Sequence, residues 1–221
     1  MSKFIKIEND NRISKECCQL ETNHLLNGKE MRTPKDNLYY ALSHTKIKNG
    51  LYLEFGVYKG RSINHIAEKI YPKKVFGFDS FFGLPENDGK YWQDHHFTLN
   101  GKNPKTFLEN VCIIEGMFEN TIEKFKHKYL ANNHISFLHI DCDIYSSTKV
   151  IFDQLENYII PGTVIVFDEY WRYEEYYDHE MKAFLEYVLK NNIRYQYLSY
   201  HKNNEKQFLN CAARVSLIIT E

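Results

Sequence analysis

The stretch "LYLEFGVYKGRSINHIAEKI", residues 51–70, decides the fold class of this 221-residue chain. Its apolar and aromatic start predicts a buried strand that ends at Gly56. Ile63, Ile66, Ala67 and Ile70 then recur at the spacing of one helix face. A strand that turns through glycine into a helix is a βα unit, the building block of parallel sheets.

The same alternation continues along the chain. Further strands are predicted at 74–81, 110–118, 135–145, 161–171, 195–200 and 212–219, and further helices at 121–130, 148–159 and 180–190. Several of these strands are almost continuously apolar, which is typical of parallel strands covered on both faces. We therefore expect an α/β fold with a mostly parallel, seven-stranded sheet between two layers of helices.

Two segments depart from this pattern. Residues 1–37 are polar, and we interpret them as an N-terminal arm or lid, with a disordered tail as the alternative. Residues 38–221 form the predicted domain. Within it, residues 83–109 make a long, polar and aromatic connection, which we interpret as an inserted substrate lid because connections of this length are usually functional or disordered.

Composition argues against several kinds of partner. The net charge is -1, so nucleic acid is not expected, and no apolar stretch is long enough for a membrane span. The five cysteines form no CxxC motif, which fits a reducing compartment without structural disulfides. There is no apolar signal segment at the start, so we expect a cytoplasmic protein.

Four carboxylates follow two strands of the predicted sheet. Asp141 and Asp143 lie in "LHIDCDIYSST" (138–148), and Asp168 and Glu169 end the strand at 161–171. Two residues apart in a strand, Asp141 and Asp143 would share one face at roughly 7 Å. Such a cluster is repulsive without a cation, and oxygen ligands suit Mg²⁺ or a similar hard ion. The alternative is that these acids cap the helices that follow.

Neighbours of these acids have structural explanations. We interpret His139 as a core histidine, and Ser146, Ser147 and Thr148 as the N-cap of the next helix. Glu180 would complement the dipole of the helix that it opens.

The glycine turn indicates which cofactor to expect. Gly56 and Gly60 fit neither the three-glycine nicotinamide fingerprint nor the phosphate loop. The E-x-G-x-x-x-G spacing resembles the first motif of S-adenosylmethionine (SAM) methyltransferases. Asp79, at the end of the next strand, could accept the ribose hydroxyls, or cap a turn instead. We expect SAM to contact Glu54, Gly56, Val57, Tyr58, Gly60, Ser62, Asp79, Gly116, Met117, Phe118 and Asp141.

Together, five stretches resemble the macrocin/mycinamicin/novobiocin-type sugar O-methyltransferases, class I enzymes that depend on SAM and magnesium. They are "EFGVYKGRS", "FGFDSFFGLP", "EGMFENT", "HIDCDIYSST" and "PGTVIVFDEYW", in the family's order between residues 51 and 171. The resemblance implies a Rossmann-like methyltransferase sheet. It also implies O-methylation of a sugar or of another glycosylated or phosphorylated small polar metabolite, by a homodimer or larger homo-oligomer.

The resemblance assigns Asp141, Asp168 and Glu169 to the metal and Asp143 to the catalytic base. Spacing alone does not separate the roles of Asp141 and Asp143, which could be exchanged. The chain has Asp168-Glu169 where the family commonly has two aspartates, and residues 1–37 and 83–109 match the family poorly. The acceptor therefore stays open.

Three other functions are compatible with parts of the sequence. A metal-dependent catechol or phenol O-methyltransferase would also place acids at these strand ends, but would need an apolar acceptor slot. A non-catalytic SAM-binding protein would keep the fold without the metal. A nicotinamide-dependent enzyme would need the third glycine that is missing here.

Overall fold

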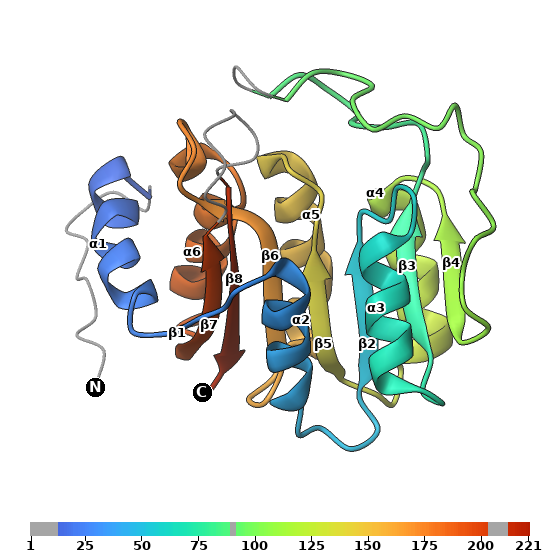
Figure 1. Cartoon of the computed structure of the whole chain (residues 1–221), viewed down its shortest axis with the longest axis horizontal. Coiled ribbons are helices and arrows are strands. Elements are labelled where there is room, and N and C mark those ends of the chain that lie inside the picture. Colours follow the sequence, from blue (N-terminus) through green and yellow to red (C-terminus); the bar gives the residue numbers. More distant parts are fainter. Residues whose placement is uncertain (1–12, 89–91, 203–211) are drawn as a thin grey trace.

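The computed structural model describes residues 13–88, 92–202 and 212–221, and these form one central sheet of eight strands (Figure 1). The strands are β1 (Lys29–Glu30), β2 (Leu51–Phe55), β3 (Val75–Asp79), β4 (Val111–Glu115), β5 (Ile135–Ile140), β6 (Val164–Trp171), β7 (Tyr195–Lys202) and β8 (Ala213–Ile219). Their order across the sheet is β1-β7-β8-β6-β5-β2-β3-β4. Only β8 runs against its neighbours β6 and β7.

The predicted mostly parallel α/β sheet is thus confirmed, with one strand more than expected. The additional strand is β1, which pairs in parallel with Ser199 and Tyr200 of β7. Two residues are too few to show an alternation of apolar and polar side chains, so the sequence gives no signal for this strand.

Six α-helices of the described residues cover the sheet. They are α1 (Lys15–Leu25), α2 (Pro34–Ser43), α3 (Arg61–Ile70), α4 (Phe118–Phe125), α5 (Tyr145–Leu155) and α6 (Glu180–Asn191). Helices α2 and α3 lie on one face, in front of the sheet in Figure 1, while α4, α5 and α6 lie behind it. A π-helical turn (Lys126–Leu130) continues α4, and short 3₁₀ turns lie at Glu156–Tyr158 and Tyr176–Asp178.

Each face of the sheet has its own apolar core. On the α2/α3 side, the predicted stripe of Ile63, Ile66 and Ala67 is fully buried against Tyr52 and Phe137. The larger core on the other side is built around stacked aromatic rings, among them Phe55 and Phe78 with ring centres 4.4 Å apart. Burial on both faces explains why the parallel strands are almost continuously apolar.

The described part of the predicted arm, residues 13–37, packs against the body of the molecule. Cys18 and Leu25 of α1 are fully buried, and the Tyr195 hydroxyl donates a hydrogen bond of 2.7 Å to Glu21 Oε1. Helix α2 begins at Pro34 with Thr33 as its N-cap, so the predicted boundary at residue 38 falls inside that helix. Residues 1–12 of the arm lie outside the described residues.

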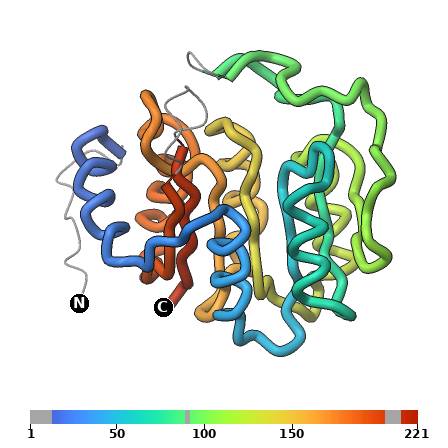
Figure 2. Tube along the Cα trace, viewed as in Figure 1, coloured from blue at the N-terminus to red at the C-terminus, as the bar shows by residue number. Residues whose placement is uncertain are grey.

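The 83–109 segment runs over the carboxyl ends of the central strands. In Figure 2 the chain leaves β3, crosses above the sheet and returns to β4. Residues 89–91 of this segment lie outside the described residues, and the rest has neither helix nor ladder strand, apart from one bridge between Asp88 and Trp92. Of the described helices, none is both long and apolar enough to cross a membrane.

Candidate active site

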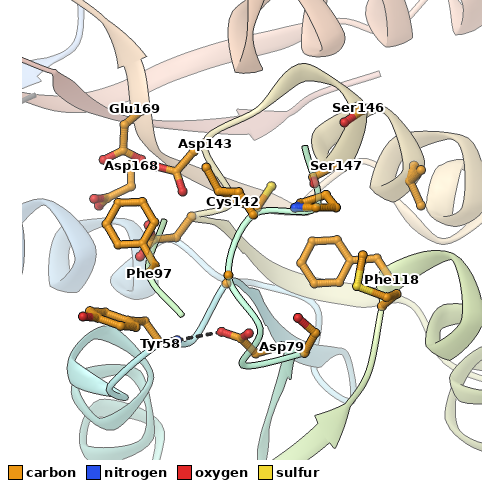
Figure 3. Close-up of a pocket in the computed structure, with 18 of the residues that line it drawn as sticks. Tyr58, Asp79, Phe97, Phe118, Cys142, Asp143, Ser146, Ser147, Asp168 and Glu169 are labelled. Atoms are coloured by element: carbon orange, nitrogen blue, oxygen red, sulfur yellow. Dashed lines mark hydrogen bonds between the residues drawn. The ribbon is translucent and has the colours of Figure 1, made fainter. Parts of the chain in front are cut away.

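A cavity of about 680 Å³ opens at the carboxyl ends of β2 to β6 (Figure 3). Its size suits a small-molecule ligand, and its position is where open α/β sheets bind theirs. The loops after β2, β3, β4 and β5 and the end of β6 each contribute to its wall: Gly56, Tyr58, Asp79, Ser80, Gly116, Met117, Phe118, Asp141, Cys142, Asp143, Asp168 and Glu169.

Gly56 allows two of these loops to meet. Its φ is +87°, and a Cβ at this position would lie 1.7 Å from the carbonyl oxygen of Asp141. Only glycine can adopt this conformation at such a close approach. The glycine at the end of β2 thus brings the turn before α3 directly against the loop that carries Asp141.

Asp79 holds the same turn from the other side. Its Oδ2 accepts hydrogen bonds from the backbone N–H groups of Val57 (2.8 Å) and Tyr58 (2.7 Å), and Oδ1 accepts one from Phe81 N–H (2.7 Å) (Figure 3). This is the turn-binding role that the sequence left as the alternative. The side chain also lines the cavity, opposite the acids of β5 and β6.

Seven of the eleven residues expected at the cofactor line the cavity: Gly56, Tyr58, Asp79, Gly116, Met117, Phe118 and Asp141. The other four lie behind the wall. Val57 is buried and contributes its backbone N–H to Asp79, and Gly60 is the N-cap of α3 with a φ of +81°. The Ser62 hydroxyl donates to Glu54 Oε1 (3.0 Å), so neither of these side chains reaches the cavity.

Glu54 belongs instead to a buried chain of charges under the cavity. Its carboxylate is fully buried, and Oε2 lies 2.8 Å from Nδ1 of His139 on β5. The other ring nitrogen, Nε2, lies 3.9 Å from Asp168 Oδ1. Burial opposes a charge on His139, but the carboxylates of Asp168 and Glu54 outweigh it and raise the histidine pKa to about 10. His139 is buried, as expected of a core histidine, but its two carboxylate neighbours favour the protonated ring.

The four predicted acids all line the cavity. Figure 3 shows Asp143, Asp168 and Glu169 together at one end, and a ligand atom of Asp141 lies within 4.8 Å of one of Asp168. The acids reach the cavity differently from the prediction, because β5 ends at Ile140. Asp141 and Asp143 lie in the following loop, where Asp143 adopts a left-handed conformation with φ +67°. The expectation that both project from one strand face is therefore wrong, although both side chains line the same cavity.

Most of these acids resist ionisation. Burial, followed by the charge of Asp168, raises the pKa of Asp141 and Glu169 and raises that of Asp143 to about 8. Asp168 is the exception. Burial alone would raise its pKa, but the Arg214 guanidinium and His139 hold it well below its usual range.

Sequence reasoning missed two residues of this cluster. Arg214 on β8 forms an ion pair with both carboxylate oxygens of Asp168 through Nε and Nη2. Glu180, interpreted as a helix-dipole partner, is fully buried, and its Oε2 accepts a hydrogen bond from Glu169 N–H (3.3 Å). The only charged residue in the mostly apolar strand "AARVSLII", an arginine, was the available signal for Arg214. Glu180 had no comparable signal.

The predicted serine N-cap is also wrong. Helix α5 begins at Tyr145, and its N-cap residue, Ile144, has no side chain that could accept a hydrogen bond. Ser146 and Ser147 lie in the first turn and line the cavity, whereas Thr148 is buried and donates to Ile144 O (3.1 Å). The serines are thus available to a ligand.

The 83–109 segment supplies part of the cavity wall, with Gly83, Leu84, Pro85, Glu86 and Phe97. Trp92 anchors the segment, since it is 2% exposed and clusters with Leu84 and Ile144. Asp88 Oδ2 accepts a hydrogen bond from Tyr145 N–H (3.0 Å) and also lies 3.1 Å from His179 Nδ1. His95 and His96 are not among the lining residues.

The acidic end of the cavity can hold a divalent cation. Asp141, Asp168 and His139 each place one potential ligand atom within 4.8 Å of the others. The carboxylate oxygens suit a hard ion, and Glu169 Oε2 is buried without a hydrogen-bond partner among the described residues. Glu169 lies outside the group of three, and His139 cannot act as a ligand while it is protonated. Asp168 meanwhile pairs with Arg214.

Comparisons with known proteins agree with this architecture. Residues 53–170 match the family described as "Methyltransferase domain", which covers just over half of the chain, from β2 to the acids of β6. No curated protein sequence matches the chain.

Several solved structures share the fold. A crystal structure of the calicheamicin methyltransferase CalS11 covers 93% of this chain and 80% of its own, at TM-score 0.62 and 18% identity. Its apo structure, described as a TDP-rhamnose 3'-O-methyltransferase, has TM-score 0.52 at 17% identity, with 93% and 81% coverage. The O-methyltransferase NovP matches 93% of this chain and 81% of its own length, at TM-score 0.55 and 18% identity. An O-methyltransferase from Bacillus cereus in complex with SAH matches 98% of this chain and 94% of its own length, at TM-score 0.53 and 15% identity. At sequence identities this low, the structural similarity shows that this chain shares their fold.

Proposed function

This chain belongs to the methyltransferase-domain family, and from that premise we propose that it is a SAM- and Mg²⁺-dependent O-methyltransferase. The proposed acceptor is a hydroxyl of a sugar or of another glycosylated or phosphorylated small polar metabolite. One observation carries the proposal: a single cavity joins the glycine turn after β2 to a cluster of acids after β5 and β6.

SAM is proposed to occupy the part of the cavity between Tyr58, Asp79 and Phe118 (Figure 3). When bound, it supplies the methyl group on a sulfonium that needs no further activation. Asp79 presents carboxylate lone pairs to the ribose hydroxyls while its backbone hydrogen bonds keep it in place. Met117 and Phe118, after β4, present the flat apolar surface that an adenine ring would contact.

The acids at the other end are proposed to activate the acceptor. A divalent cation held by Asp141, Asp168 and Glu169 would lower the pKa of an acceptor hydroxyl. Asp143 then takes the hydroxyl proton. Burial and the charge of Asp168 raise the pKa of this carboxylate, which strengthens it as a proton acceptor. Much of the rate should come from holding the oxygen in line with the methyl group.

A sugar-containing acceptor is favoured by two features. CalS11, which shares the fold over 93% of this chain, is described as a TDP-rhamnose 3'-O-methyltransferase. In this chain, Phe97 of the 83–109 segment and Tyr58 lie edge to face beside the acids, with ring centres 5.6 Å apart. Aromatic faces next to carboxylates offer both the stacking surface and the hydrogen-bond acceptors that a sugar ring uses.

A second candidate acceptor is a catechol or another phenol. Leu84 and Phe97 give the cavity an apolar component that could receive an aromatic ring. The same acids and cofactor would serve this reaction, so the acceptor alone separates the two candidates.

A methyl-transfer screen with radiolabelled SAM tests the proposal. The panel contains nucleotide sugars, sugar phosphates and catechol, each with Mg²⁺ and with EDTA. Labelled product from a sugar-containing acceptor, formed only with Mg²⁺, is the expected result. Product from catechol alone would select the second candidate. Calorimetric titration with SAM and with NAD provides the cofactor control, and binding of NAD without SAM would contradict the proposal.

A further inference from the structure

We propose that Arg214 is a built-in counter-ion of the acid cluster that competes with the divalent cation for Asp168. In this view the guanidinium neutralises Asp168 when no cation is bound, and must release the carboxylate when one binds. The inference rests on the metal dependence proposed above, and it assigns a role to a residue outside the predicted ligand set.

The geometry of the ion pair is the first support. Arg214 projects from β8, the antiparallel strand beside β6, and reaches Asp168 where the β6–β8 register is interrupted between Phe167 and Trp171. Nε pairs with Oδ1 and Nη2 with Oδ2, so both carboxylate oxygens of Asp168 are engaged. A fork of this kind is the strongest geometry that arginine offers to a carboxylate.

The position of Asp168 makes the two partners compete. Asp168 is one of the residues whose ligand atoms lie within 4.8 Å of one another, together with Asp141 and His139. A cation bound there would share the Asp168 oxygens with the guanidinium. Two positive centres a few ångströms apart in a buried site repel strongly. Cation binding at full strength therefore requires Arg214 to move.

Arg214 has room to do so. Its side chain is 25% exposed, whereas that of Asp168 is 12% exposed. The residue lines the same cavity as Asp141, Asp143 and Glu169, so the guanidinium can turn along the cavity wall without unfolding its strand. Of the described residues that line this cavity, Arg61 and Arg214 carry a permanent positive charge. Arg214 is the one paired with Asp168.

Mn²⁺ titration of the purified full-length protein, followed by calorimetry, tests the proposal. We expect Arg214→Gln to bind Mn²⁺ more tightly than wild type, on the order of tenfold, because a competing charge is removed. The matched control is Arg194→Gln, which also removes one arginine charge, but from an exposed pair with Glu221 at the C-terminus. Its Mn²⁺ affinity should equal that of wild type.

Thermal unfolding provides a second readout that does not depend on activity. Without a cation, Arg214→Gln should unfold at a lower temperature than wild type, because Asp168 loses its counter-ion. Saturating Mn²⁺ should raise the unfolding temperature of the variant more than that of wild type.

Equal or weaker Mn²⁺ binding by Arg214→Gln would overturn the inference while leaving the proposed metal dependence intact. Absence of Mn²⁺ binding by wild type and variant alike would overturn both. If Arg214→Gln does not fold, Arg214→Met decides the question, since it also removes the positive charge but keeps a long unbranched side chain. Tighter binding than wild type supports competition, and unchanged or weaker binding contradicts it.

Discussion

Two neighbouring carboxylates of this cavity have opposite acid–base properties. Asp168 pairs with Arg214 and with His139, so its pKa lies well below the usual range. Burial and the charge of Asp168 raise the pKa of Asp143 to about 8. This division suits a site in which one acid stays ionised and the other exchanges a proton.

We expect Asp143→Asn to lower the rate of methyl transfer by at least about 10²-fold, since a positioned base typically contributes that much. SAM affinity, measured by calorimetry, should stay within a few-fold of wild type, because Asp143 lies at the acidic end of the cavity. Asp153→Asn, on the exposed side of α5, is the control and should keep full activity. Full turnover by Asp143→Asn would remove Asp143 as the base.

The Glu54–His139 pair gives a second prediction, about stability. Replacing Glu54 by Gln leaves a buried histidine without its charged partner, so the free energy of unfolding should fall by about 2 kcal/mol. Chemical denaturation measures this change. Glu68→Gln, an exposed acid on α3, should change the free energy by less than about 1 kcal/mol. A similarly small effect for Glu54→Gln would mean that the pair contributes little.

At this scale the sequence identified the acids but not their partners. Asp141, Asp143, Asp168 and Glu169 stand out because carboxylates at the ends of apolar strands are conspicuous. Arg214 lies 46 residues beyond Asp168, and only the antiparallel return of β8 brings the two together. Glu54 stood in a glycine motif, so a cofactor role was inferred, and its burial against His139 depends on the parallel pairing of β2 with β5.

At the scale of elements, Asp88 and Trp92 fasten the first half of the 83–109 segment. Asp88 connects it to the first turn of α5 through Tyr145 N–H and to His179 before α6. Trp92 fills the apolar space beside Ile144. The later part of the segment is held separately, because Asn64 hydrogen-bonds both Thr106 O and Leu108 N–H. Loss of the Asp88 contacts can therefore open the part around Asp88 locally without unfolding the sheet.

We therefore expect Asp88→Ala to increase amide hydrogen exchange within 83–88 and 92–98. The KM for the acceptor should rise several-fold with little change in SAM affinity, because the residues proposed for SAM belong to the strand-end loops. Asp94→Ala, an exposed acid of the same segment, is the control. Unchanged exchange in Asp88→Ala would show that Asp88 does not fasten the segment.

Element boundaries show where pattern reasoning reaches its limit. The prediction continued the β5 strand to residue 145, but the ladder ends at Ile140 and α5 already begins at Tyr145. Ile144 is apolar because it packs against Trp92, so it prolongs the apolar pattern although it does not belong to the strand. That contact joins segments far apart in the sequence, so no local window contains it.

For the molecule as a whole, the mostly parallel sheet and its two helix layers followed from the alternation of strands and helices, whereas the order of the strands was not predicted. Seven strands and four helices were predicted from 51 onward, and each has a counterpart in the structure. The edge strand β1 and the packing of α1 were not predicted, because both depend on tertiary contacts with β7 and its neighbours.

The acid cluster should make global stability depend on pH. Asp143 has a folded pKa of about 8 against about 3.9 when unfolded, and His139 one of about 10 against about 6.5. Both groups bind more protons in the folded state, so stability falls as pH rises. The pKa of Asp168 is lowered in the folded state, so this group makes stability rise with pH, but only below about pH 4.

In EDTA, the unfolding temperature should therefore decrease between about pH 6.5 and about pH 8.5. Mg²⁺ should reduce this decrease, because a cation favours the ionised acids. Asp143→Asn, which removes one of the titrating groups, should show a shallower slope in EDTA. Thermal scans across this range check the prediction, and stability that rises with pH would contradict it.

The most direct test of the central claim is the initial rate of methyl transfer as a function of Mg²⁺, with an acceptor identified in the screen. The claim is that the acids after β5 and β6 act with a divalent cation on a hydroxyl. It predicts that EDTA abolishes methyl transfer from SAM and that added Mg²⁺ restores it. A rate that is the same in EDTA and in Mg²⁺ would contradict it.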